Sequence, residues 1–155
     1  MSRGDKRGVA LLVTNPKREI IILEEFQEKR EFGKLAGMFS IPMETSEPAE
    51  DDCLTLKRLV EHELCGFNSK IYIERLSGSY QVVPGIWVFL YVAQFPDCVL
   101  PSLDPTGEVG NHRWMNPRMA LDLRLRQGAR EMIRDYLNGY GYSGKIVRFK
   151  CKEVI

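Results

Sequence analysis

The sequence predicts one α+β domain, an α/β/α sandwich in which a mixed β-sheet is packed between helices. One observation is the length of 155 residues, which fits one domain and is enough to bury an apolar core. Another is composition, because 44% of the residues are hydrophobic and 28% are charged, as in ordinary globular proteins. Strand-like apolar runs also alternate with segments of helical spacing, which indicates that sheet and helix are mixed along the chain.

The first half of the chain contains three expected strands and the clearest helix, in chain order Gly8–Thr14, Glu19–Phe26, Met38–Pro42 and Asp51–Leu64. The first strand is a continuous apolar run, and the second is rich in β-branched residues. Turn residues Asn15–Arg18 between them predict a hairpin. The helix has apolar residues at helical spacing, a start that Asp51 or Asp52 can cap, and Gly66 where a left-handed C-terminal residue belongs.

The second half is expected to add four strands, at Lys70–Leu76, Ser79–Val83, Ile86–Phe95 and His112–Met115. Pro117 opens a helical turn, and an amphipathic helix follows at Gln127–Leu137. The alternating segment Lys145–Val154 is predicted to be a final edge strand. We therefore expect a single domain over residues 1–155, with its core at about 8–137 and the edge strand at about 145–154.

Net charge and cysteine usage exclude several classes of function. The formal net charge is +1, which argues against general binding to nucleic acids or membrane surfaces, since both need a large positive field. No apolar stretch reaches membrane-spanning length, and the polar start has no signal-peptide pattern. Four cysteines lie far apart without a CxxC pair, so we expect reduced thiols in a cytoplasmic protein and no zinc site.

Carboxylates gather in the loop that follows Pro42 and in the helix behind it. The acids of this stretch are Glu44, Glu47, Glu50, Asp51, Asp52, Glu61 and Glu63. Acids in a loop that feeds a helix can hold a hard cation such as Mg²⁺, which prefers oxygen ligands. The alternative is that they keep the helix soluble and complement its dipole, and charge alone favours this second interpretation.

The spacing within this stretch resembles the box of the Nudix family, written G-x5-E-x7-R-E-U-x-E-E-x-G-U, where U is an apolar residue. The matching residues supply the proline of a PGG turn, the two acids of an ExGE segment, and the arginine, apolar residue and last acid of the box helix. In that order they are Pro42, Glu47, Glu50, Arg58, Val60 and Glu63. The resemblance extends over roughly Gly8–Leu137 and implies the Nudix fold.

The box departs from the family at four positions. Met43 and Glu44 replace the paired glycines, Leu59 stands at the acid of RE, and His62 stands at the first acid of EE. Positions 59, 62 and 63 are expected to share one helical face, on which Glu63 is the remaining carboxylate. Losing a general base typically removes a factor of about 10² to 10⁴ in rate, so the departures predict weakened hydrolysis.

The resemblance implies roles for individual residues, with Mg²⁺ or Mn²⁺ as cofactor and a small nucleotide-like molecule as substrate. The implied catalytic residues are Glu63 and Glu108, and the implied metal ligands are Glu63, Glu47 and His62. The structural residues of the box are Pro42, Glu47, Glu50 and Arg58, with Glu47 expected to pair with Arg58. Expected substrate contacts are Phe39, Arg30 and Lys34. Each also has a plainer interpretation, as a core aromatic residue, a solvated loop charge or a polar helix residue.

Two functions of different class are consistent with the sequence. The leading one, by analogy with the family, is a weakened Nudix-type hydrolase of a pyrophosphate substrate in which a nucleoside diphosphate is linked to another group. The alternative is a non-catalytic Nudix-like module that binds a nucleotide or a protein partner. The basic edge strand adds a third expectation, self-association as a homodimer.

Overall fold

The computed structural model describes residues 4–64, 70–100, 108–139 and 142–150. Its strands are β1 (Lys6–Thr14), β2 (Ile20–Glu25), β3 (Phe39–Ser40), β4 (Met43–Thr45), β5 (Lys70–Val83), β6 (Ile86–Gln94), β7 (Val109–Met115) and β8 (Tyr142–Lys150). Its helices are α1 (Asp52–Glu63), α2 (Pro117–Ala120), α3 (Ala129–Asn138) and the 3₁₀ turn η1 (Arg30–Phe32).

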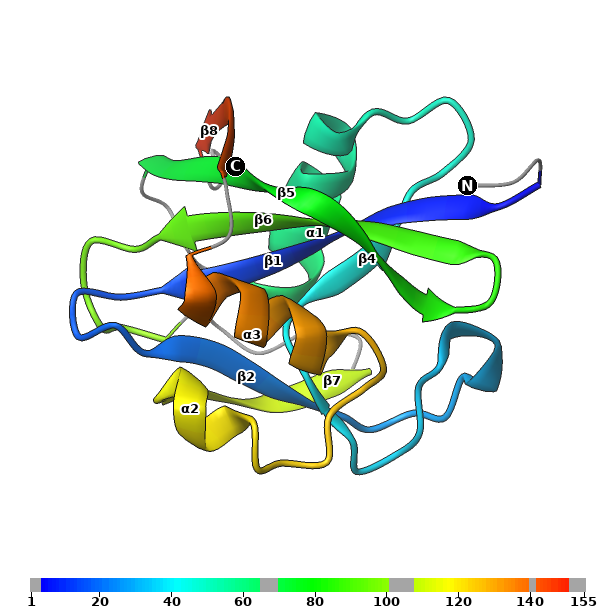
Figure 1. The fold of residues 1–155 in the computed structure, drawn as a ribbon, viewed down its shortest axis with the longest axis horizontal. Coiled ribbons are helices and arrows are strands. Elements are labelled where there is room, and N and C mark those ends of the chain that lie inside the picture. The colour runs from blue at the N-terminus through cyan, green and yellow to red at the C-terminus, as the bar shows by residue number, and fades with distance from the viewer. Residues whose placement is uncertain (1–3, 65–69, 101–107, 140–141, 151–155) are drawn as a thin grey trace.

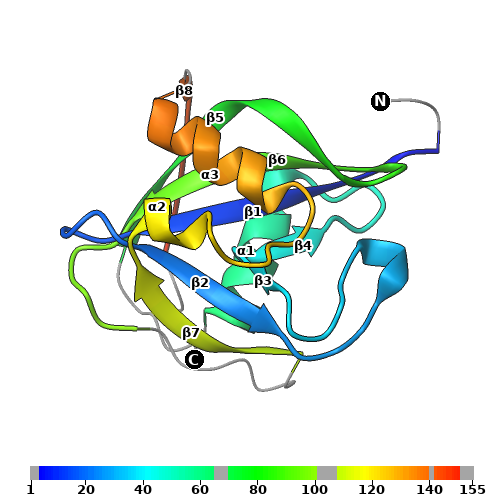
Figure 2. The same ribbon diagram turned by 60° about the horizontal axis from the view of Figure 1, so that its bottom comes forward.

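The strands form one mixed sheet with the order β3-β2-β1-β6-β5-β8, in which β4 also pairs with β1 and β7 with β2. β1 and β6 run parallel from Lys6 opposite Ile86 to Thr14 opposite Gln94, and the other strand pairs of the described residues are antiparallel. Helix α1 covers one face of the sheet, and α2 and α3 lie on the other (Figure 1, Figure 2). The predicted mixed sheet between helices is confirmed.

Both faces of β1 are buried, which explains why its sequence is apolar without alternation. Val9 and Leu11 pack with Leu59 of α1 in one core cluster. Leu12 points to the opposite face and packs with Ile133 of α3 in the second cluster. Successive side chains of a strand alternate between faces, so one continuous apolar run serves both halves of the core.

The predicted hairpin of β1 and β2 is paired beside its turn, where Thr14 lies opposite Ile20. Nearer the start of β1, Gly8–Ala10 pair with β4 instead of β2. The carbonyl of Pro42 accepts the backbone N–H of Leu11 at 2.9 Å, so a residue without an N–H fits this position. The sequence analysis expected strand structure to end at Pro42 and did not predict β4, in which the chain continues beside β1.

The two strands predicted at Lys70–Leu76 and Ser79–Val83 are a single strand, β5. Its register against β6 shifts between Arg75 and Ser79. Gly78 lies in this stretch with φ 112, a conformation that glycine adopts without strain. A β-bulge thus bends one strand where the sequence indicated an interruption.

Two other strands begin earlier than predicted, β7 at Val109 rather than His112 and β8 at Tyr142 rather than Lys145. β8 ends the sheet order and pairs with β5. Residues 151–154 of the predicted edge strand, and the predicted cap Gly66, lie outside the described residues.

The helices begin at polar caps. Asp51 accepts the backbone N–H of Leu54 at 2.9 Å at the start of α1, so of the two predicted caps, Asp51 and Asp52, the structure uses Asp51. Asn116 accepts the N–H of Arg118 at 2.9 Å at the start of α2. Among the described residues, no helix has the length and apolar character needed to cross a membrane.

Gly8 lies where β4 approaches β1, and a Cβ added there would sit 2.5 Å from the backbone oxygen of Glu44. We expect Gly8→Ala to lower the free energy of unfolding by roughly 1–3 kcal/mol, because two paired backbones must separate. Urea denaturation measures the change. Gly110→Ala is the matched control, since its added methyl meets the ring of Phe26, a side chain that is 44% exposed and can swing away. An equal loss in both variants would contradict this explanation.

Candidate functional site

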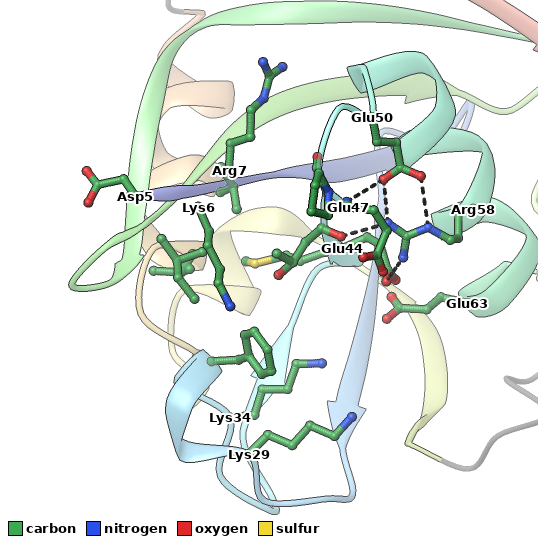
Figure 3. A pocket seen from close by; sticks show the side chains of 18 of the residues that line it. Asp5, Lys6, Arg7, Lys29, Lys34, Glu44, Glu47, Glu50, Arg58 and Glu63 are labelled. Atoms are coloured by element: carbon green, nitrogen blue, oxygen red, sulfur yellow. Dashed lines mark hydrogen bonds and ion pairs between the residues drawn. The ribbon is translucent and has the colours of Figure 1, made fainter. Parts of the chain in front are cut away.

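A pocket of about 700 Å³ opens at the end of the sheet where β1 begins and β4 leads into the loop before α1. Its walls come from β1, β4, α1 and the loops that follow β2 and precede β7 and α3 (Figure 3). The cationic residues that line it are Lys6, Arg7, Lys29, Lys34, Arg58 and Arg126. The acidic ones are Asp5, Glu44, Glu47, Glu50, Glu63 and Glu108. Counted over the described residues, six cations face six acids, so the lining is highly charged with its two signs in balance.

Arg58 of α1 organises the acidic wall. Its Nη1 lies 2.5 Å from Glu44 Oε1, and its Nη2 and Nε donate to the two carboxylate oxygens of Glu50 at 2.7 and 3.3 Å. Nη2 also donates to the carbonyl of Thr45 at 2.8 Å. The guanidinium therefore pairs with Glu44 and Glu50, whereas the sequence analysis expected Glu47 as its partner. Glu44 can reach Arg58 because β4 places it next to α1.

The loop between β4 and α1 is held to the helix by further hydrogen bonds. Thr55 Oγ1 of α1 lies 2.8 Å from Ser46 Oγ and donates to Glu50 Oε1 at 2.9 Å. Glu50 Oε1 also accepts the backbone N–H of Glu47 at 2.9 Å. Ala49 adopts φ 65, a left-handed conformation that is energetically unfavourable for any residue with a Cβ atom. The loop keeps its shape here without a glycine.

Glu63 lies at the other end of α1, is 7% exposed and lines the same pocket. Its backbone carbonyl accepts a hydrogen bond from His112 Nε2 at 2.8 Å. Arg126, 4% exposed, donates to the carbonyl of Phe32 at 2.5 Å and lies 4.0 Å from Glu25 Oε1. Burial lowers the pKa of Arg126 and raises the pKa of Glu25. Sequence reasoning missed both residues; a local signal existed for Glu25 alone, as a charge at the end of an apolar run.

The sequence analysis expected box positions 59, 62 and 63 of α1 to share one face, but of these three only Glu63 lines the pocket. Leu59 is fully buried and packs in the core beneath the helix. His62 is exposed and does not line the pocket. Adjacent helical residues point about 100° apart, so a helix that turns Glu63 to the pocket turns His62 away from it. An acid restored at position 59 would enter the apolar core.

Of the predicted metal ligands, Glu63 and Glu47 both line the pocket, whereas His62 does not. Glu44 and Glu50, the other acids of this wall, are already bound by Arg58. Among the described residues, no group of three or more His, Cys, Asp or Glu side chains is placed to hold a metal ion. The donor set does not fit the Mg²⁺ or Mn²⁺ that the resemblance implies.

Of the predicted substrate and loop residues, Lys34 and Glu108 line the pocket. Lys29, which the sequence did not single out, donates to Glu108 Oε1 at 2.7 Å. Figure 3 shows Lys6, Lys29 and Lys34 on the side of the pocket away from the acids around Arg58. The pocket is therefore polarised, with a cationic wall opposite an acidic one.

Two predicted substrate residues do not reach the pocket. The side chain of Arg30 is 77% exposed and pairs with Glu28 at 3.1 Å. Phe39 lies outside the lining residues, beneath the guanidinium of Arg113 at 5.3 Å from the ring centroid. Phe32, from η1, is the aromatic residue that lines the pocket. The expected substrate contacts of Arg30 and Phe39 were therefore wrong. In η1 it is Phe32, not Arg30, that faces the pocket, and in β3 the side chain of Phe39 packs against Arg113 instead.

No family model matches the sequence, and no curated protein matches it. A NUDIX hydrolase from Nitrosomonas europaea matches the structure with TM-score 0.64 and 19% identity, over 89% of this chain and 92% of that chain. The C-terminal domain of mouse MUTYH, from a complex with human PCNA, gives 0.66 and 17% identity over 87% and 89%. The NUDIX domain of Shewanella oneidensis NrtR, complexed with ADP ribose, gives 0.63 and 12% identity over 89% and 90%.

These likenesses extend over most of both chains in each pair, and their low identities establish the fold alone. The chain has the Nudix fold, as the box spacing and its flanks predicted.

Arg58 holds the pKa of Glu50 at about 2, below its usual value of 4.5. Because the folded-state pKa is the lower one, the stabilisation from this pair is complete above pH 4.5 and is lost as the pH falls toward 2. We expect the free energy of unfolding to fall more steeply across this window in the wild type than in Glu50→Gln. Urea denaturation at stepped pH values measures both slopes, with Glu61→Gln as the control for an exposed acid of α1. Equal slopes in the wild type and Glu50→Gln would contradict the assignment.

Proposed function

We propose that this chain is a Nudix-fold module that binds a nucleotide-like, phosphate-bearing molecule in the pocket and needs no divalent metal to bind it. The observation that supports this best is the pairing of Glu44 and Glu50 with Arg58. Metal-assisted hydrolysis needs carboxylate oxygens that are available to a cation. Here one guanidinium binds both of these acids, and Leu59 and His62 occupy two of the acid positions of the family box.

The cationic wall supports a phosphate-bearing ligand. Lys6 and Lys34 line the pocket, and within the described residues neither forms an ion pair. Ammonium groups bind phosphate oxygens through charge-assisted hydrogen bonds. The half-buried side chain of Phe32 also lines the pocket and offers an aromatic surface on which a base can stack. Lysines and a ring together favour a nucleotide over inorganic phosphate.

ADP ribose is the first probe, because the NrtR NUDIX domain was solved with it. We expect ADP ribose to bind in the presence of EDTA and Lys34→Gln to weaken binding roughly tenfold, the effect of one lost charge-assisted hydrogen bond. Isothermal titration calorimetry measures both. Lys57→Gln, which removes an exposed cation of α1 outside the pocket, should bind as the wild type does. Binding that requires added Mg²⁺, for ADP ribose or other nucleotides, would overturn the proposal.

The second candidate is a hydrolase of a nucleoside-diphosphate-linked substrate, and the position of Glu63 favours it. This carboxylate is almost buried yet lines the pocket, with Glu47 and Glu108 on the same pocket surface. A buried acid beside a bound pyrophosphate is suited to take a proton from an attacking water. In this alternative Glu63 is the residue on which turnover depends.

A hydrolysis panel separates the two candidates. The wild type and Glu63→Gln are compared on nucleoside-diphosphate-linked substrates with Mg²⁺ or Mn²⁺, and Glu61→Gln serves as the matched acid outside the pocket. From the binding proposal we expect the same background release of phosphate products from all three proteins. A drop of about 10²-fold or more that is confined to Glu63→Gln would establish the hydrolase instead.

A further inference from the structure

A second pocket, of about 800 Å³, lies at the opposite end of the sheet from the first. It is bounded by the turn between β1 and β2, the end of β6, the start of α2 and the last turns of α3. Figure 1 shows that these segments lie together, away from β4 and η1, which border the first pocket. Its size falls in the range of pockets that hold small molecules.

The charge of this pocket is of one sign. Lys17, Arg18 and Arg118 line it, and no acidic residue of the described chain does. None of the three forms an ion pair within the described residues. Three like charges around one cavity repel each other, and an anion placed between them relieves that repulsion. In contrast to the first pocket, the charge here is not balanced from within.

Asn15 fixes the turn that carries two of these cations. Its side chain is 5% exposed, and its Oδ1 accepts the backbone N–H groups of Lys17 at 2.9 Å and Glu19 at 3.0 Å. Its Nδ2 donates to Glu19 Oε1 at 3.1 Å, so this nearby acid is bound to Asn15 and does not line the pocket. The turn therefore presents its cations from a fixed frame, which lowers the entropic cost of binding.

Arg18 supports a binding role through its backbone. It adopts φ 62, a left-handed conformation that glycine adopts readily and that is energetically unfavourable for arginine. A turn selected for stability alone is better served by glycine at this position. The retained side chain is one of the three cations around the pocket.

The remaining walls are suited to an organic group. Phe95 is 3% exposed, and Tyr136 and Leu137 of α3 also line this pocket. The hydroxyl of Tyr136 donates to Thr14 Oγ1 at 3.5 Å, a long hydrogen bond that donation to a ligand oxygen can replace. Apolar rings next to three cations match a molecule with a phosphate at one end and an apolar body at the other.

We propose that this second pocket binds a small phosphorylated molecule, with its phosphate held by Lys17, Arg18 and Arg118. The site stands apart from the first pocket and does not depend on the function proposed for it. A nucleic-acid strand is the less suitable ligand, because proteins that bind nucleic-acid backbones contact about 6–10 phosphates, and three cations on a chain of net charge +1 provide little of that field.

The test is a titration of the ¹⁵N-labelled protein with inorganic phosphate and with pyrophosphate, at constant ionic strength set with chloride. We expect saturable shifts of the backbone amides of Lys17, Arg18 and Arg118 in the wild type. The double variant Arg18→Gln/Arg118→Gln should raise the dissociation constant roughly tenfold or more, since each charge-assisted bond is worth about a factor of ten. Lys57→Gln is the matched control and should leave the constant unchanged.

Arg18→Gly gives a second, independent readout. It relieves the left-handed backbone and should raise the melting temperature while it weakens phosphate binding, so loss of folding cannot explain the result. Unsaturable shifts for both anions, or equal affinities in the wild type and the double variant, would overturn the proposal. So would binding of a single-stranded oligonucleotide at this site more tightly than pyrophosphate.

Discussion

The guanidinium of Arg58 joins β4, the loop that follows it and α1 through contacts with Thr45, Glu44 and Glu50. Contacts in which a guanidinium grips a carboxylate with two nitrogens are among the stronger polar interactions of proteins. Removing the cation would leave two carboxylates facing each other at the mouth of the pocket, where their repulsion would open the loop. The shape of the acidic wall, and hence the pocket itself, depends on this group of contacts.

The same contacts restrict the chemistry of the pocket. Arg58 occupies oxygens of Glu44 and Glu50 and offsets part of their negative charge, so these two carboxylates have fewer oxygens available to a metal ion, and their remaining charge disfavours a phosphate on this wall. In the proposed function, Lys6 and Lys34 on the facing wall are the groups that bind the phosphate. Glu63 is the exception on the acidic side, because it is separated from Arg58 along the helix and sits near the buried Arg126. The two functions proposed for the pocket therefore rest on different walls, phosphate binding on the lysines and hydrolysis on Glu63.

Local patterns were enough to predict β1 and the Asp51 cap, since strand periodicity and capping are decided by near neighbours. The box spacing also predicted that Arg58 faces the acidic loop. The choice of Glu44 over Glu47 as its partner was not predictable, because it follows from β4 pairing with β1 far away in sequence. Arg126 was missed for the same reason, since its burial beside the pocket depends on contacts between distant segments.

The parallel pairing of β1 with β6 has a consequence for how the chain reaches this fold. The pairing of β1 with β6 begins with Lys6 opposite Ile86, so more than half of the polypeptide must be synthesised before these two central strands can pair. Contacts between residues so distant in sequence carry a large loop-closure cost and slow the search for the native state. Until β6 arrives, the apolar face of β1 is exposed to other chains, and this interval is when the nascent protein is most prone to aggregate.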